Sequence, residues 1–240
     1  MDDIMTMHES PLLEFRNVVK SYGSNRVLDE ISFSIGRGGI IGLLGPNGCG
    51  KSTIIKLICG LLVANKGEIL INGEPPSHIT AAQVSYLPDK NALPSGVSVN
   101  YLLDFYGDFF ADFDRAKALD MLARLSIDPK NRVRTLSKGT CEKVQLILAM
   151  SRDAQLYVLD EPLGGVDPAA REYILETILK SYNKNSSVLI TTHLVSDVER
   201  VLDDVIFVDN GKAALCASVA GLREQHGKSV DEIFREVYRC

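Results

Sequence analysis

Two apolar runs, residues 40–44 and 54–63, enclose the stretch Gly45-Pro46-Asn47-Gly48-Cys49-Gly50-Lys51-Ser52-Thr53. The first run has the length of a buried strand and the second favours a helix. A glycine-rich loop that ends in Lys-Ser between a strand and a helix is the arrangement that a phosphate-binding loop requires. A glycine turn that happens to end in Lys-Ser is the alternative, and the flanking strand and helix favour the phosphate-binding loop.

The residue types in this loop suit an anion. Glycines let the backbone curl so that several N–H groups point at one phosphate, and the positive end of the following helix lies at the same place. Lys51 is expected to reach the β- and γ-phosphates of a nucleotide, and the Ser52 hydroxyl is expected to bind Mg²⁺. The loop therefore predicts a nucleotide site with a magnesium ion.

Composition places the chain among soluble globular proteins. Its 240 residues are 45% hydrophobic and 24% charged, with a net charge of −5, which gives no reason to expect nucleic acid as a direct partner. No apolar stretch approaches the ~20 residues that cross a bilayer, and the acidic residues 1–10 do not resemble a signal peptide. The scattered cysteines have neither metal-ligand nor disulfide spacing (Cys49, Cys59, Cys141, Cys216 and Cys240), as expected in a reducing cytosol.

Patterning along the chain predicts an α/β fold with three parts. Alternation in residues 13–18 and 31–35 indicates an antiparallel pair, and residues 67–73 indicate a strand closed by an Asn-Gly turn. Helical spacing dominates residues 91–152, which we interpret as a helical lobe inserted into the sheet domain. We expect a main domain over residues 11–215 and a short tail over residues 216–240, with an amphipathic helix from Ser229.

Strand signals return after the lobe. Residues 156–159 and 188–190 are uniformly apolar, as central parallel strands covered on both faces should be. A helical segment at about residues 169–182 lies between them and completes a βαβ unit. The predicted fold is thus a mostly parallel sheet of the P-loop NTPase type, with an antiparallel edge subdomain and an inserted helical lobe.

Two carboxylates follow the strand at residues 156–159. Asp160 and Glu161 lie at its carboxyl end, the edge at which open α/β sheets bind ligands. Asp160 is predicted to hold the magnesium ion through a water, and Glu161 to orient or deprotonate the attacking water. The alternative is that the acidic pair only caps the next helix. The neighbouring phosphate-binding loop favours the catalytic interpretation.

His193 and Ser137 are further candidates. His193 follows the strand at residues 188–190, so the same sheet edge predicts a sensor of the γ-phosphate, although a lone histidine is more often a surface or core residue. Ser137 precedes a helical run and fits an ordinary helix N-cap.

With these motifs the chain resembles the ATP-binding subunit of an ABC (ATP-binding cassette) transporter, from about Leu12 to Asn210. The phosphate loop, the family signature at Leu136-Ser137-Lys138-Gly139-Thr140, the acidic pair and the histidine occur in the family's order and spacing. The resemblance implies that Tyr22 stacks on adenine, that Ser137 and Gly139 bind the nucleotide, and that Asp167 belongs to a loop by which two cassettes communicate. It also implies ATP and Mg²⁺ as ligands.

Chain geometry independently suggests a second copy. A helix of about 14 residues after Ser137 spans ~21 Å, and the strand that leads to Asp160 adds more than ~15 Å. Ser137 and the Gly139 N–H are therefore expected to point away from their own phosphate loop. A head-to-tail dimer, with itself or with a paralogous cassette, would place each signature on the partner's nucleotide.

Three positions depart from the family pattern. Asp89 stands in the loop where Gln is usual, and its carboxylate could bind the metal directly. Lys138 and Thr140 replace Gly and Gln in the signature; Lys138 could add charge near a neighbouring nucleotide or could be solvated. Cys49 is interpreted as a small residue that the loop tolerates, although its place near a helix N-terminus could lower the pKa of its thiol.

The expected function is ATP hydrolysis that powers a transporter, of exporter type by its short length. The resemblance implies a separate membrane-spanning permease that docks around Asp89 and the helical lobe, and a cytoplasmic position, peripheral on the inner face of the cell membrane. The alternatives are a soluble ABC ATPase in cofactor assembly or nucleic-acid work, and a nucleotide switch that barely turns over. A small GTPase is disfavoured because no Asn-Lys-x-Asp guanine motif is present.

Overall fold

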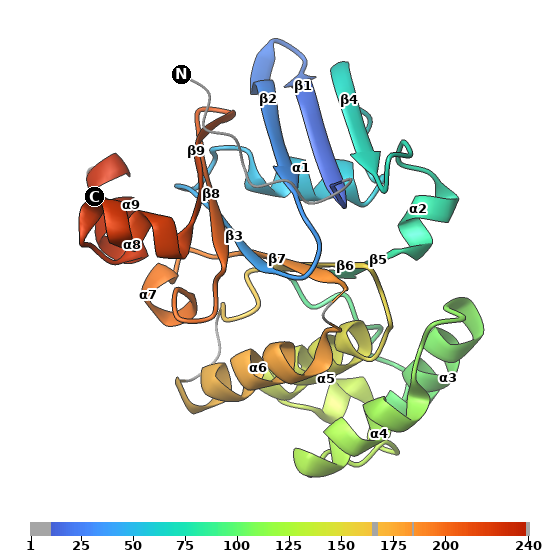
Figure 1. Cartoon of the computed structure of the whole chain (residues 1–240). Coiled ribbons are helices and arrows are strands. Elements are labelled where there is room, and N and C mark those ends of the chain that lie inside the picture. Colours follow the sequence, from blue (N-terminus) through green and yellow to red (C-terminus); the bar gives the residue numbers. More distant parts are fainter. Residues whose placement is uncertain (1–10, 165–167, 184, 239–240) are drawn as a thin grey trace.

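A computed structural model describes residues 11–164, 168–183 and 185–238, and its strands form two sheets (Figure 1). The smaller sheet has the order β2-β1-β4 and is antiparallel throughout; its strands are β1 Leu13–Tyr22, β2 Asn25–Ile35 and β4 Lys66–Ile71. Leu13 lies opposite Ile35 in this sheet, which confirms the antiparallel pair predicted near the start. The subdomain is a separate sheet and not an extension of the large one.

The larger sheet has the order β5-β6-β7-β3-β8-β9 and is parallel except for β9. Its strands are β3 Ile40–Leu44, β5 Val84–Leu87, β6 Leu156–Asp160, β7 Ser187–Thr191, β8 Asp204–Asp209 and β9 Lys212–Ser218. β6 and β7 are parallel neighbours on either side of α6 in the sequence, so the predicted βαβ unit is confirmed. The α/β fold with a mostly parallel sheet is confirmed with it.

The helices begin where the sequence offers capping side chains. Ser98, Asp114 and Ser137 each accept a hydrogen bond from a backbone N–H in the first turn that follows, which satisfies donors that the helix itself leaves free. The described helices are α1 Lys51–Ile58, α2 His78–Ala82, α3 Val99–Phe109, α4 Arg115–Arg124, the 3₁₀ turn η1 Val133–Thr135, α5 Lys138–Met150, α6 Pro168–Ser181, α7 Val195–Val198, α8 Val219–His226 and α9 Val230–Tyr238. None of the helices in the described part of the chain is long and apolar enough to cross a membrane.

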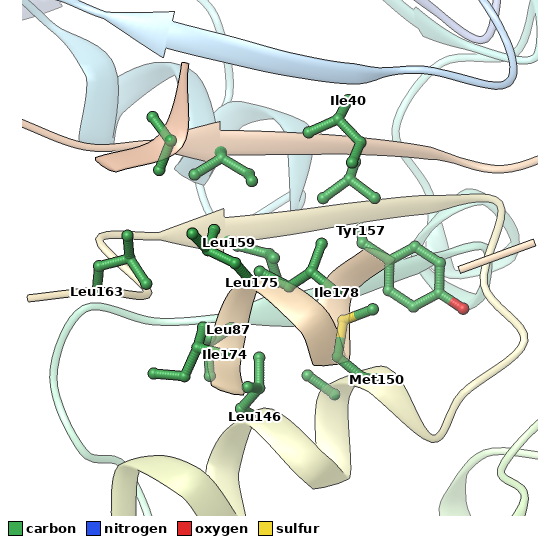
Figure 2. Close-up of a cluster of buried hydrophobic side chains, with 14 of the residues drawn as sticks. Ile40, Leu87, Leu146, Met150, Tyr157, Leu159, Leu163, Ile174, Leu175 and Ile178 are labelled. Carbon is green, nitrogen blue, oxygen red and sulfur yellow. The ribbon is translucent and has the colours of Figure 1, made fainter. Parts of the chain in front are cut away.

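Both faces of the central strands of the larger sheet are buried, and alternate residues of these strands belong to different cores. Ile41 and Leu43 face α1 and the antiparallel sheet, whereas Ile40 and Leu44 join the core formed with the helices on the other face. Figure 2 shows this second core, in which side chains of α5 and α6 meet those of β6. This double burial explains the uniformly apolar strands in the sequence.

Arg152 joins the helical region to the edge strand β5. Its side chain is only 3% exposed and forms a two-nitrogen pair with Asp112, with both N–O distances 3.0 Å. The guanidinium also donates to the Val84 and Ala82 carbonyls and lies 3.9 Å from the centre of the Phe110 ring. One buried cation therefore satisfies acceptors from two separate segments of the chain, Asp112 in one and Ala82 and Val84 in the other.

We predict that Arg152→Met lowers the free energy of unfolding by about 3 kcal/mol, because Asp112 and two carbonyls lose their donor together. Guanidinium denaturation followed by circular dichroism measures this. Arg124→Met is the control, since Arg124 pairs with Asp120 on an exposed helix face and its loss should cost less than about 0.5 kcal/mol. Equal midpoints for the two variants would contradict the role given to Arg152.

Candidate functional site

Parallel pairing brings the predicted residues to one edge of the larger sheet. Asp89 follows β5, Asp160 ends β6, His193 follows β7 and the loop at residues 45–53 follows β3. A cavity of about 320 Å³ opens there, lined by Val27, Asn47, Gly48, Gly50, Lys51, Ser52, Thr53, Asp89, Asp160 and Glu161. Carboxyl ends of parallel strands are where α/β sheets bind ligands.

The glycine loop has the backbone that its sequence predicts. Gly50 has a φ of 114°, in the left-handed region, and a Cβ there would lie 2.7 Å from Leu28 Cδ2. The Thr53 and Ile54 N–H groups donate to the Gly50 carbonyl at 2.9 and 3.0 Å, which starts α1 directly after the loop. Any side chain at position 50 would therefore disturb both the loop and the helix start.

Lys51 is buried against this loop. Its ammonium donates to the Gly45 carbonyl at 2.7 Å and to the Pro46 carbonyl at 3.0 Å. A buried cation held by neutral carbonyls next to a helix N-terminus favours an anion in the cavity. Polyphosphate fits the donors that this wall of the cavity presents.

Three carboxylates, those of Asp89, Asp160 and Glu161, line the same cavity. Burial raises the pKa of the Asp160 carboxyl; the Thr191 hydroxyl, which donates to Asp160 Oδ1 at 2.6 Å, opposes this shift, while the Asp89 and Glu161 charges add to it and Lys51 lessens it. A divalent cation would relieve the repulsion among these carboxylates. Hydroxyl and carboxylate oxygens of Ser52 and Asp160 are the ligand types that Mg²⁺ prefers.

Protein groups alone do not complete a metal site here. Within the described ranges, no group of three or more His, Cys, Asp or Glu side chains is arranged to hold a metal ion. Mg²⁺ characteristically keeps waters and binds through one or two carboxylates together with substrate phosphates. The residues present therefore fit a metal that binds with a nucleotide.

Glu161 is held in an uncommon backbone conformation. Its φ is 50°, and its N–H donates to the Thr191 carbonyl at 3.0 Å and to the Thr191 hydroxyl at 3.1 Å. The carboxylate shares a 2.9 Å hydrogen bond with His193 Nδ1. The Glu161 side chain is 16% exposed and that of His193 is 59% exposed, so the carboxylate is fixed while the imidazole faces outward.

Thr191 is the residue that the sequence analysis did not single out. It ends β7 directly opposite Asp160 on β6 and bonds to both members of the acidic pair. The sequence shows only a threonine at the end of an apolar strand. Its importance for the site can be recognised only when β6 and β7 are known to be neighbours.

Other candidates lie outside the cavity lining, namely His193, Tyr22, Ser137 and Gly139. Tyr22 ends β1 and is 46% exposed, with Lys20 Nζ 5.5 Å from its ring centre. Ser137 caps α5, accepting from the Thr140 N–H at 3.1 Å, and is exposed, with Gly139 half-buried in the first turn. α5 covers the sheet face opposite α1 (Figure 1), so the structure does not bring Ser137 to the phosphate loop of its own chain.

Lys138 and Thr140, the two residues that depart from the family signature, interact with nearby residues of α5 and its cap. Lys138 has a side chain 78% exposed and lies 3.8 Å from Glu142, so it is solvated in the single chain. The Thr140 hydroxyl lies 2.8 Å from that of Ser137 and supports the cap. Asp167, predicted in the loop between cassettes, lies outside the described residues.

The lowered pKa considered for the Cys49 thiol is wrong. Its side chain is buried, and burial raises the pKa of the thiol above its ordinary value, although the nearby Lys51 charge opposes this. Desolvation therefore outweighs the helix N-terminus, and the thiolate is disfavoured at neutral pH.

The family comparison agrees with this geometry. The profile of the family described as ABC transporter matches residues 28–164, which include the loop, the signature and the acidic pair. The chain belongs to the ABC transporter family. It is an ATP-binding subunit of that family, whose general activity is ATP hydrolysis.

The alignments with similar proteins cover nearly the whole of this chain. Nod factor export ATP-binding protein I of Rhizobium sp. is 33% identical over 92% of this chain and 76% of its own length. ABC transporter ATP-binding protein YtrB of Bacillus subtilis is 30% identical over 90% of this chain and 75% of its own. A solved ATP-binding subunit of an ABC transporter has a TM-score of 0.84 and 29% identity, and the match covers 95% of this chain and 99% of that one.

Proposed function

We propose that this chain hydrolyses ATP at the cavity beside α1 and that the hydrolysis powers a transporter. The observation that carries the proposal is that Lys51 lines the same cavity as Asp160 and Glu161. Phosphoryl transfer needs positioning and charge neutralisation more than covalent chemistry. These residues supply both.

Each residue has a distinct task in this proposal. Lys51 contacts the β- and γ-phosphates, which the backbone of residues 45–53 also binds, and Tyr22 stacks on adenine. Glu161 accepts a proton from the attacking water or orients that water. His193, hydrogen-bonded to Glu161, contacts the γ-phosphate and holds the carboxylate in place. Thr191 fixes the backbone that carries both carboxylates.

Ser52, Asp160 and Asp89 would hold the magnesium ion that accompanies the nucleotide. Bound there, the ion neutralises phosphate charge in the transition state. Asp160 is oriented by Thr191, whereas Asp89 enters from the loop after β5. The assignment of Asp89 is supported by its position in the cavity lining.

A second cassette, identical or paralogous, completes the site in this proposal. Ser137 and Gly139 lie at the start of α5, where backbone N–H groups favour an anion, and Ser137 is exposed. A partner arranged head to tail would bring its own Ser137 and Gly139 to the open side of the cavity. ATP would then hold the two cassettes together, and its hydrolysis would release them.

The permease is proposed to bind a second hollow, of about 420 Å³, beside β5 and α3. It is lined by Cys59, Leu61, Ala81, Val84, Ser85, Tyr86, Tyr106, Phe109, Phe110, Ala149 and Arg152. Phe109 is 70% exposed, and exposed aromatic side chains around a hollow favour a protein partner. Tyr86 precedes Asp89 by a few residues, so this hollow is joined to the nucleotide site by a short segment.

Export is the proposed direction, and the relatives named for Nod factor export support it. The proposed location is cytoplasmic, on the inner face of the cell membrane, where a permease would hold the cassette. No nucleic acid is proposed as a direct partner. The net charge of −5 supports this view.

Glu161→Gln should lower kcat for ATP hydrolysis by about 100-fold or more, since it removes a general base, and should leave ATP affinity within about threefold. Phosphate release and calorimetric titration measure the two effects. Light scattering with ATP and Mg²⁺ should show a dimer that persists in this variant. Glu176→Gln, at an exposed position of α6, is the control. A Glu161→Gln protein that is fully active, or that stays strictly monomeric, would refute the proposed mechanism.

Asp89→Gln should raise the Mg²⁺ concentration that gives half-maximal ATPase activity by about tenfold, the scale on which groups supporting a metal affect its affinity. A magnesium titration at saturating ATP measures this. The control is Asp120→Asn, on the exposed face of α4. An unchanged titration curve would remove Asp89 from the metal site.

Phe109→Asp should reduce the recovery of a multi-span membrane protein with the tagged cassette by about tenfold or more, because a central aromatic anchor contributes ~2 kcal/mol or more. Affinity capture from gently solubilised membranes measures it, with ATP binding as a check of folding. Leu179→Asp, at an exposed apolar position of α6, is the control. Equal recovery with both variants would place the partner elsewhere.

A further inference from the structure

The helix α9 packs against β8, the strand beside β3 and the phosphate loop that follows it. Its side chains Phe234 and Tyr238 meet Phe207 of β8, with ring centres 6.0 and 6.1 Å from that ring and 4.8 Å from each other. The Tyr238 hydroxyl donates to the Val208 carbonyl at 2.9 Å. The helix thus ends in a polar contact with β8.

The Val208 carbonyl also touches the loop. A Cβ on Gly45 would lie 2.4 Å from this oxygen and 2.6 Å from Cys49 Sγ. Gly45 is therefore enclosed between the carbonyl that accepts from Tyr238 and the Cys49 side chain. A small displacement of that carbonyl toward Gly45 would press on the first residue of the loop.

The pairing of β8 is irregular at this point. Pairing between β3 and β8 ends at Leu44 with Phe207, and the register between β8 and β9 shifts between Phe207 and Val208. The turn beyond holds the loop too, since the Gly211 N–H donates to the Cys49 carbonyl at 3.1 Å. Tyr238 therefore bonds to the strand where its ladder is irregular and where it adjoins the loop.

Burial raises the pKa of the Tyr238 hydroxyl, and the Cys49 and Asp209 charges raise it further. The hydroxyl therefore stays protonated across the physiological range. It can therefore donate to the Val208 carbonyl.

We propose that Tyr238 is a positioning residue for the phosphate loop, which fixes the Val208 carbonyl against Gly45 and so sets ATP affinity without touching the nucleotide. This inference rests on the proposed binding of phosphates by residues 45–53. Loss of the hydroxyl lets β8 shift behind Gly45 and Cys49, which loosens the loop. The chemistry at Glu161, which is not part of this loop, is unaffected.

The test compares Tyr238→Phe with Tyr157→Phe. Tyr157 is a matched control because its buried hydroxyl also donates to a backbone carbonyl, that of Arg152 at 2.6 Å, away from the nucleotide loop. Tyr238→Phe should weaken ATP binding by about fivefold, the factor that one ordinary hydrogen bond supplies, raise KM similarly and leave kcat unchanged. Alkylation of Cys49 by iodoacetamide, followed by peptide mass spectrometry without nucleotide, should accelerate by a similar factor.

Tyr157→Phe should lose comparable stability in denaturation and leave ATP affinity and the Cys49 rate unchanged. Phe234→Leu, which loosens α9 but keeps the hydroxyl, should shift both quantities in the same direction as Tyr238→Phe. The proposal is overturned if Tyr238→Phe changes neither quantity, or if Tyr157→Phe changes both equally. The rate of Cys49 alkylation tests the role of Tyr238 even if the protein binds no ATP. A failure to bind ATP would instead refute the proposed function.

Discussion

Parallel pairing of β5, β6, β7 and β3 is the constraint on which the site depends. It brings a buried lysine and three carboxylates, from loops distant in the sequence, around one cavity. Asp160 lies opposite Thr191, and Leu43 lies opposite the same threonine on the other side. A slip of one residue in either ladder would turn Asp160 or Thr191 to the wrong face of the sheet.

Apolar burial enforces this register. Both faces of the central strands are covered, one by α1 and the antiparallel sheet and the other by α5 and α6. Every residue of β3, β6 and β7 is buried, so a shifted strand has no solvent face to which its polar end could turn. The same strand register thus determines both the packing of the apolar core and the placement of the charged residues of the site.

Much of this architecture could be predicted from the sequence, because the signals were local. The Lys-Ser ending of the glycine loop, the acidic pair after an apolar strand and the antiparallel pair each depend on residues close together in the chain. Thr191 and Tyr238 escaped notice because their importance depends on which strands are neighbours. The pKa of Cys49 was misjudged because helix position can be inferred from sequence, whereas the depth of burial could not.

Arg152 has a consequence for how such a protein could change over evolutionary time. Its guanidinium anchors β5 to the segment after α3, and the same residue lines the hollow beside Phe109 and Phe110. If a membrane partner binds in that hollow as proposed, a lineage that acquires a new partner must reshape the hollow without disturbing this cation, so variation should concentrate in the aromatic residues of α3. The structural role of one residue then limits how the proposed docking surface can diversify.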